Sequence, residues 1–325
     1  MLEAAAVRLE PPTLEAVQEA RRRITGTALR TPLIALPSTP GATRILLKLE
    51  NLQPIGSFKL RGAANAMALA APDTLALGVY TASVGNMAQG VAWCARERGI
   101  PCRVIVPETA PENKLAAIAR LGATAVKVPF DVWWAAMINH GHPGMDGLFI
   151  HPFADTNVMA GNATIGLELL EDAPELDTVL VPWGGGGLAC GIASALRAVA
   201  PHVRVYAVEL DAAAPLSASL ARGEATAITP ERTFVDGIGG RGVAPEMFAL
   251  AQELLAGVLC VSLGQVAAAV KLLAEQCRVV AEGAGAAAVA AALVGVPDAT
   301  SVACVVSGGN IDSHIFASIL RGETP

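Results

Sequence analysis

Residues 56–63 read GSFKLRGA and place Lys59 between two glycines. They follow an apolar, strand-like run at residues 44–49 (RILLKL) and precede an alanine-rich helical pattern. A lysine at the start of a helix is usually a solvated charge. A lysine that forms a Schiff base needs a partly apolar place instead, because desolvation lowers its pKa and frees the amine. The apolar neighbours Phe58 and Leu60 are consistent with this second interpretation.

Strand-like runs alternate with helical patterns through most of the chain. Strands are predicted at residues 44–49, 77–80, 102–107, 123–129, 178–182, 203–209 and 302–306. Helices are predicted at residues 62–71, 87–98, 111–121, 160–170, 187–200, 263–276 and 285–293. This alternation is typical of α/β proteins, and nearly continuous apolar strands indicate parallel sheets that are covered on both faces. Ligands of such sheets bind beyond the carboxyl ends of the strands.

Three more strand-to-helix loops carry unusual residues. Residues 81–86 (TASVGN) place small polar side chains at a helix N-terminus, where backbone N–H groups and the helix dipole favour a carboxylate. Residues 183–188 (WGGGGL) contain four glycines, which let successive N–H groups surround a phosphate. Residues 306–310 (VSGGN) present a hydroxyl suited to a ring nitrogen. Taken alone, each loop is also compatible with an ordinary turn or helix cap.

The motifs GSFKLRGA, TASVGN, GGGG and SGGN, in this order, resemble the threonine/serine dehydratase and serine racemase family of fold-type II pyridoxal-phosphate (PLP) enzymes, which are similar to tryptophan synthase β. Further matches are KLENLQP (48–54), HPF (151–153), AGNATIGLELLE (160–171) and AEGAGAAA (281–288). The resemblance implies an α/β fold with two three-layer αβα domains and mostly parallel sheets. Residues 1–76 and 156–325 would form a large PLP-binding domain, with a small domain, residues 77–155, inserted in it.

The same resemblance implies a role for each loop. Lys59 would bind pyridoxal 5′-phosphate and later remove the Cα proton of the substrate, whose carboxylate Ser83 would bind. The other cofactor contacts would be Phe58 at the ring, Asn86 at the phenolic oxygen, Gly184, Gly185, Gly186, Gly187 and the Leu188 N–H at the phosphate, and Ser307 at the ring nitrogen. A serine does not force that nitrogen to stay protonated, which suits β-elimination.

These roles predict an ammonia-lyase that converts a β-hydroxy amino acid such as L-threonine or L-serine into a 2-oxo acid and ammonia. Racemisation is disfavoured, since serine racemases carry a second serine where this chain has Val84. Cysteine-synthase-type β-replacement is disfavoured because Leu60 breaks the usual SxKDR pattern. The glycine-rich stretch 234–243 keeps open a larger substrate, such as phenylserine, 3-hydroxyaspartate or a hydroxyectoine-derived amino acid. A non-enzymatic dinucleotide-binding protein, with Glu209 as ribose ligand, is the remaining alternative.

A metal site is not expected. Some relatives bind a divalent cation through a glutamate, a backbone carbonyl and an aspartate two residues later. Glu209 and Ala213 match the first two positions, but Pro215 stands at the third and supplies no carboxylate.

The composition excludes several other classes of protein. Of 325 residues, 53% are hydrophobic and 16% charged, with a net charge of -6, which argues against disorder and against nucleic-acid partners. The mean hydropathy is +0.49, but the most apolar stretch, residues 279–296, is rich in Ala and Gly and contains Glu282, so it predicts a buried loop and helix rather than a membrane span. Six dispersed cysteines and the lack of a signal pattern indicate a cytoplasmic protein. We expect a homodimer whose other partner is its amino-acid substrate.

Overall fold

The computed structural model describes residues 9–37, 43–231 and 233–325. Its strands are β1 (Leu33–Ala35), β2 (Arg44–Lys48), β3 (Val79–Ala82), β4 (Cys102–Pro107), β5 (Thr124–Val128), β6 (Leu148–Phe149), β7 (Thr178–Pro182), β8 (Arg204–Leu210), β9 (Gly257–Val261) and β10 (Ser301–Val305). Its α-helices are α1 (Leu14–Ile24), α2 (Lys59–Ala68), α3 (Pro72–Ala76), α4 (Asn86–Glu97), α5 (Glu112–Arg120), α6 (Phe130–Ile138), α7 (Thr156–Asp172), α8 (Gly187–Val199), α9 (Pro215–Arg222), α10 (Pro245–Leu254), α11 (Leu263–Leu272), α12 (Gly283–Val294) and α13 (Ser313–Leu320). A 3₁₀ turn, η1 (Glu50–Leu52), and a π turn, η2 (Leu273–Cys277), complete the set.

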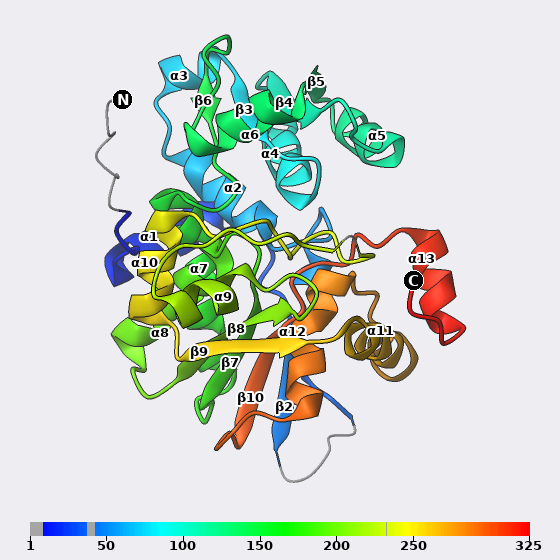
Figure 1. Ribbon diagram of the computed structural model, residues 1–325. Helices are drawn as coiled ribbons and strands as arrows, with labels where there is room; N and C mark the ends of the chain where they lie inside the picture. The colour runs from blue at the N-terminus through cyan, green and yellow to red at the C-terminus, as the bar shows by residue number, and fades with distance from the viewer. Residues whose placement is uncertain (1–8, 38–42, 232) are drawn as a thin grey trace.

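The strands form two sheets. The larger has the order β1-β2-β10-β7-β8-β9, and the smaller has the order β5-β4-β3-β6. Neighbouring strands are parallel in both sheets, except that β1 pairs with β2 antiparallel. The two sheets lie in separate parts of the molecule, and helices surround each of them (Figure 1). The predicted α/β fold with mostly parallel sheets is confirmed.

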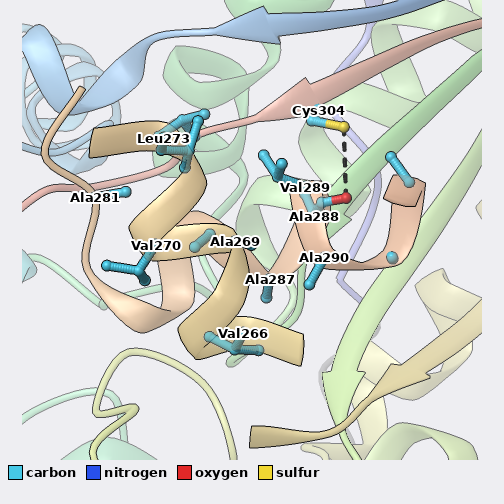
Figure 2. Close-up of a cluster of buried hydrophobic side chains, with 14 of the residues drawn as sticks. Val266, Ala269, Val270, Leu273, Ala281, Ala287, Ala288, Val289, Ala290 and Cys304 are labelled. Carbon is cyan, nitrogen blue, oxygen red and sulfur yellow. Dashed lines mark hydrogen bonds between the residues drawn. The ribbon is translucent and has the colours of Figure 1, made fainter. Parts of the chain in front are cut away.

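Each face of the six-stranded sheet has its own core, because successive side chains of a strand point to opposite faces. On β2, Ile45 and Leu47 join the core that contains α11 and α12, whereas Leu46 joins the core that contains α7 and α8. Figure 2 shows the first core, in which small side chains of α12 pack against larger ones of α11, and the Cys304 Sγ–H donates to the Ala288 carbonyl over 3.4 Å.

The apolar stretch 279–296 forms a short loop and then α12, as predicted. Within α12 the residues from 283 to 292 are buried, and their small side chains let the helix pack closely on β7 and β10. None of the helices in the described ranges combines the length and the apolarity that a membrane crossing requires.

Several elements differ from the pattern-based expectation. The pattern predicts a helix from residue 62, but α2 begins at Lys59, three residues earlier. The helices α9 and α10 are absent from the prediction and begin at Pro215 and Pro245. Proline tends to be taken as a helix breaker, but it suits the first position of a helix, where its missing N–H costs no hydrogen bond.

The four-stranded sheet falls within residues 79–149, inside the segment 77–155 that the sequence suggests as a small domain. The domain boundaries themselves stay a prediction. Part of the suggested large domain, residues 1–8, 38–42 and 232, lies outside the described residues.

Candidate active site

Four loops follow the carboxyl ends of strands and lead into helices or turns. The Lys59 segment follows β2 and η1, and Ser307 follows β10, which is the parallel neighbour of β2. The glycine loop, residues 183–188, follows β7, the next strand of the same sheet. Parallel neighbours end at the same edge of a sheet, so three of the four loops share one edge. The fourth loop lies between β3 and α4 of the smaller sheet.

Lys59 is the first residue of α2, and its side chain is partly buried. Its Nζ donates a 2.5 Å hydrogen bond to the carbonyl of Pro152 and lies 5.1 Å from the centre of the Phe58 ring. Burial lowers the pKa of Lys59 to about 8, because removing the ammonium from water disfavours its charged form. The side chain thus meets the requirement that the sequence suggested, namely an amine that is neutral more easily than usual.

Backbone hydrogen bonds join the Lys59 segment to the SGGN loop. The Phe58 N–H donates to the carbonyl of Ser307 over 3.0 Å, and the Gly309 N–H donates to the carbonyl of Gly56 over 2.9 Å. Ser57 and Gly308 form an isolated antiparallel bridge between these two pairs. Ser307 and Phe58 therefore lie side by side.

Asn86, the first residue of α4, brings the fourth loop to the same place. Its Oδ1 accepts a 2.7 Å hydrogen bond from the amide of Asn310, and its Nδ2 donates to Glu282 Oε1 over 2.7 Å. Asn310 also donates to the carbonyl of Ile55, close to Lys59 in the chain. The side chain of Asn86 therefore links the loop after β3 of the smaller sheet to the SGGN loop.

Glu282 is a site residue to which the sequence motifs assign no role. Burial raises the pKa of its carboxyl to about 7, and the hydrogen bond from Asn86 opposes that shift. A carboxylate inside a run of Ala, Gly and Val is costly to bury unless something pairs with it. That interruption of the apolar stretch is the signal in the sequence that points to Glu282.

The glycine loop passes so close to its neighbours that side chains would not fit. A Cβ on Gly185 would lie 2.2 Å from the ring of Phe153, and one on Gly187 would lie 2.5 Å from the Phe153 carbonyl oxygen. Gly186 has a φ of +91°, a left-handed conformation that favours glycine, and a Cβ there would meet the Trp183 ring at 2.4 Å. The loop leads into the 13-residue helix α8, whose first N–H groups lack partners within the helix.

The HPF segment links the glycine loop to Lys59, although the sequence motifs give it no part in the site. Phe153 packs on the glycines, and the preceding residue, Pro152, accepts the hydrogen bond from Lys59. His151 holds this turn, because its Nδ1 accepts from the N–H groups of Phe153 and Ala154. Burial lowers the pKa of His151 to about 3, so the ring is neutral and serves as an acceptor.

Ser83 and Val84 lie between β3 and α4, directly before Asn86. The hydroxyl of Ser83 accepts from the N–H of Gly85 over 3.2 Å, which shapes the turn into α4. Val84 is partly buried and packs against the core that contains α2 and α4. Ser83 therefore lies near the site because it precedes Asn86 by three residues in the chain.

Glu209, one of the two residues considered for a cation, has both carboxylate oxygens engaged. They accept 2.8 Å hydrogen bonds from the N–H groups of Leu216 and Ser217 at the start of α9. Burial raises the pKa of the Glu209 carboxyl to about 7, and these two bonds oppose the shift. Ala213 pairs with Leu210 in an isolated bridge. In the described part of the chain, no cluster of three or more His, Cys, Asp or Glu residues could hold a metal.

The residues present fit a phosphorylated aldehyde cofactor. The glycine loop leaves no room for a Cβ beside its neighbours, and it presents N–H groups at a helix N-terminus as a cradle that suits a phosphate. At the same edge lies a partly buried lysine whose amine is easily neutral, which suits the aldehyde.

The comparisons with known proteins agree with this fit. A family model described as pyridoxal-phosphate dependent enzyme matches residues 24–308. The chain is 38% identical to an L-threonine ammonia-lyase of Thermotoga maritima, covering 95% of this chain and 78% of that protein. It is 41% identical to an L-threonine ammonia-lyase of Geobacter sulfurreducens, covering 94% of this chain and 77% of the relative.

Solved structures give the same result. Maize serine racemase superposes with a TM-score of 0.87 at 28% identity, covering 96% of this chain and 98% of that one. The processed form of threonine deaminase isoform 2 from Solanum lycopersicum superposes with a TM-score of 0.84 at 28% identity, covering 97% of this chain and 91% of that one. The chain therefore belongs to the pyridoxal-phosphate dependent enzymes, and within them to the threonine/serine dehydratase and serine racemase family.

Proposed function

We propose that this chain is a PLP-dependent ammonia-lyase that converts L-threonine or L-serine into the corresponding 2-oxo acid and ammonia. The observation that carries the proposal is Lys59, a partly buried amine at the point where the glycine loop, the SGGN loop and Asn86 converge. Curated relatives that are 38% and 41% identical are L-threonine ammonia-lyases, which supports the same reaction here.

Each loop then has a task in holding the cofactor. The N–H groups of residues 184–188 would bind its phosphate, and Phe58 would cover one face of its ring. Asn86 would donate Nδ2 to the phenolic oxygen, since its Oδ1 already accepts from Asn310. Ser307 would contact the ring nitrogen, and its place beside Phe58 supports this assignment.

Lys59 has the second task, which is proton transfer. The bound cofactor supplies an electron-withdrawing ring that makes the Cα proton of the substrate acidic. Lys59 Nζ would take that proton, and its lowered pKa keeps a useful fraction of the amine neutral near pH 7. The hydroxyl of Ser83 and the N–H groups at the start of α4 would hold the substrate carboxylate.

The overall reaction balances without an oxidant or reductant. Cα loses a proton and Cβ loses its hydroxyl, so one water leaves. The product hydrolyses with one water, which gives the 2-oxo acid and releases the amino group as ammonia. Val84 has no proton to return to Cα from the other side, which favours elimination over racemisation.

A direct assay tests the proposal and its alternatives together. The purified enzyme is expected to release a 2-oxo acid and ammonia in equal amounts from L-threonine or L-serine. The same assay with 3-hydroxyaspartate, phenylserine and a hydroxyectoine-derived amino acid tests for a larger substrate. Appearance of the D-amino acid without ammonia would show a racemase instead, and thiol capture from an activated serine would show β-replacement.

The pKa of Lys59 gives a pH prediction for the full-length chain from which the cofactor has been removed. Only the neutral amine attacks an aldehyde, so the rate of PLP attachment is expected to rise as the pH passes through about 8 and to level off above it. At pH 7 a group with this pKa is about 10% neutral, against roughly 0.03% for an ordinary lysine. Stopped-flow absorbance across the pH range measures the midpoint. A midpoint near 10 would contradict the burial of Lys59.

We also propose that the enzyme is a cytoplasmic homodimer built from the two domains suggested above. The cysteines of the described residues are all free, which suits a reducing compartment. The observation that supports the homodimer is a pair of exposed apolar side chains. Leu52 and Val280 are about half exposed and lie on adjoining segments, since the Asn51 amide donates to the Val280 carbonyl. Light scattering measures the oligomeric state, and limited proteolysis near residues 77 and 155 tests the domain boundaries.

A further inference from the structure

Four charged side chains lie buried together beneath α2. Lys48, Glu50, Arg61 and Glu168 are each at most 4% exposed, and we call them the buried charge cluster. They come from β2, η1, α2 and α7, and their charges sum to zero. Neither the glycine loop nor the SGGN loop contributes to the cluster, and Arg61 is its member in the Lys59 segment, residues 56–63.

Arg61 is the centre of the cluster. Its guanidinium donates to both carboxylate oxygens of Glu50, each over 2.8 Å. It also donates to both oxygens of Glu168, over 2.7 and 2.9 Å. Lys48 Nζ lies 2.6 Å from the second oxygen of Glu168. Arg61 also donates to the Thr164 hydroxyl and to the Leu29 carbonyl, each over 3.0 Å, so that one of its five N–H groups is shared between two acceptors.

This arrangement specifies a geometry. Replacing a buried ion cluster with apolar residues of similar volume is often neutral or stabilising, so stability alone does not explain such a cluster. A planar guanidinium that serves two carboxylates at once allows one orientation only, which a lysine cannot reproduce. The cluster therefore fixes the position of the helix turn that carries Arg61.

That turn is the first turn of α2, and Lys59 begins it. Residues two apart on a helix point to opposite sides, because each residue turns the chain by about 100°. Arg61 consequently points into the buried charge cluster, while Lys59 points away from it and reaches the Pro152 carbonyl. The first two N–H groups of the helix make only long hydrogen bonds. Phe58 makes no side-chain cap, and the hydrogen bonds of the Lys59 and Leu60 N–H groups to Ser57 are 3.4 and 3.5 Å long.

The same cluster also includes a residue of the helix that follows the acceptor of Lys59. Glu168 lies on α7, which begins shortly after Pro152, the residue whose carbonyl accepts from Lys59 Nζ. The two helices touch closely, since a Cβ on Gly161 of α7 would lie 2.4 Å from the Arg61 carbonyl oxygen. Arg61 therefore ties the helix that carries the amine to the helix that follows its acceptor.

We propose that Arg61 is a positioning residue for Lys59. Through the buried charge cluster it holds the first turn of α2 against α7, so that Lys59 Nζ stays beside Pro152 and out of bulk water. The proposal rests on the proposed role of Lys59 as the cofactor lysine, and it adds the reason why that amine is sheltered.

The test is Arg61→Lys in the full-length chain, which keeps the positive charge but loses the planar fork. Competitive labelling with an amine reagent, read by mass spectrometry with Lys271 as internal reference, gives the pH midpoint for Lys59 without any cofactor. We expect this midpoint to rise by at least about one pH unit, since an amine that moves toward water approaches its ordinary pKa. The Kd for PLP is expected to rise at least about 10-fold, with kcat lowered more than KM is changed.

Two further variants keep the test decisive. Val270→Ala removes volume from the buried face of α11 in the core on the other side of the sheet, and it controls for lost stability (Figure 2). It is expected to lower the Tm without moving the Lys59 midpoint. Thr164→Val removes one hydrogen bond from Arg61 at nearly constant volume, and it is expected to shift the midpoint in the same direction by a smaller amount. It serves in place of Arg61→Lys should that variant not fold.

The proposal is overturned if both cluster variants keep the wild-type midpoint and Kd, or if Val270→Ala shifts them equally. Failure of the proposed function is a separate outcome, because peptide mapping of the reduced holoenzyme would then place the cofactor on another lysine. The labelling midpoints report on Arg61 in either case, because they need no cofactor.

Discussion

Lys59→Ala is expected to lower kcat for ammonia release by at least about 10³-fold and to abolish the visible absorbance of the lysine-bound cofactor. Alanine offers neither an amine for the aldehyde nor a base for the Cα proton, so both tasks of the residue disappear together. The side chain reaches no farther than Pro152 and the Phe58 ring, so the fold is expected to stay intact. Absorbance of the purified protein and a coupled 2-oxo acid assay measure the two losses.

Lys271→Ala is the matched control for this variant. Lys271 lies on α11, is partly exposed and pairs with Glu275 at 3.9 Å, which is a weak surface ion pair. Its removal is expected to leave both colour and turnover unchanged. Full activity of Lys59→Ala, or retention of its visible absorbance, would show that another residue carries the cofactor.

Gly187→Ala is expected to weaken PLP binding by roughly 10- to 100-fold, which corresponds to the loss of one or two charge-assisted hydrogen bonds to a phosphate. The added Cβ would lie 2.5 Å from the Phe153 carbonyl oxygen and 2.9 Å from its Cα. Backbone atoms cannot turn aside as a side chain can, so the start of α8 has to move. The N–H groups of the cradle move with it. Fluorescence or absorbance titration of the cofactor-free chain measures the Kd.

The control for this prediction is Gly264→Ala, near the start of α11. A Cβ there would meet nothing closer than the Ser262 hydroxyl oxygen at 3.9 Å, and the residue has no left-handed φ. The Kd for PLP is expected to stay at the wild-type value. If Gly187→Ala also leaves the Kd unchanged, the glycine loop is not the phosphate site.

The fold class and most of the site loops are predictable from the sequence because their signals are local. Four glycines after an apolar strand, or a lysine between apolar neighbours before a helix, need only a few consecutive residues to be recognised. The strand at residues 178–182 and the helix that follows it begin where the pattern places them. Lys59, Asn86 and Ser307 are recognised for the same reason, since each belongs to a short motif that follows a strand.

The rest depends on contacts between distant segments. Nothing near Pro152 in the sequence indicates that its carbonyl meets an amine 93 positions away. The stacking of His140 on His151, with ring centres 4.4 Å apart, likewise arises only when α6 and the HPF segment fold together. The two oxygens of Glu209 that cap α9 are a third case, because the cap becomes visible only once Pro215 is recognised as a helix start.

The small residues of α12 have a consequence for how the site can evolve. Gly285 stands so close to the SGGN loop that a Cβ would lie 2.2 Å from the Gly308 carbonyl oxygen. A single methyl group there would push the helix away and carry Glu282, one turn earlier, out of reach of Asn86. The hydrogen bond between these two side chains thus depends on the absence of a Cβ at position 285. Substitutions that add a side chain at position 285 are therefore excluded, and a change in the chemistry around Asn86 has to arise from other segments.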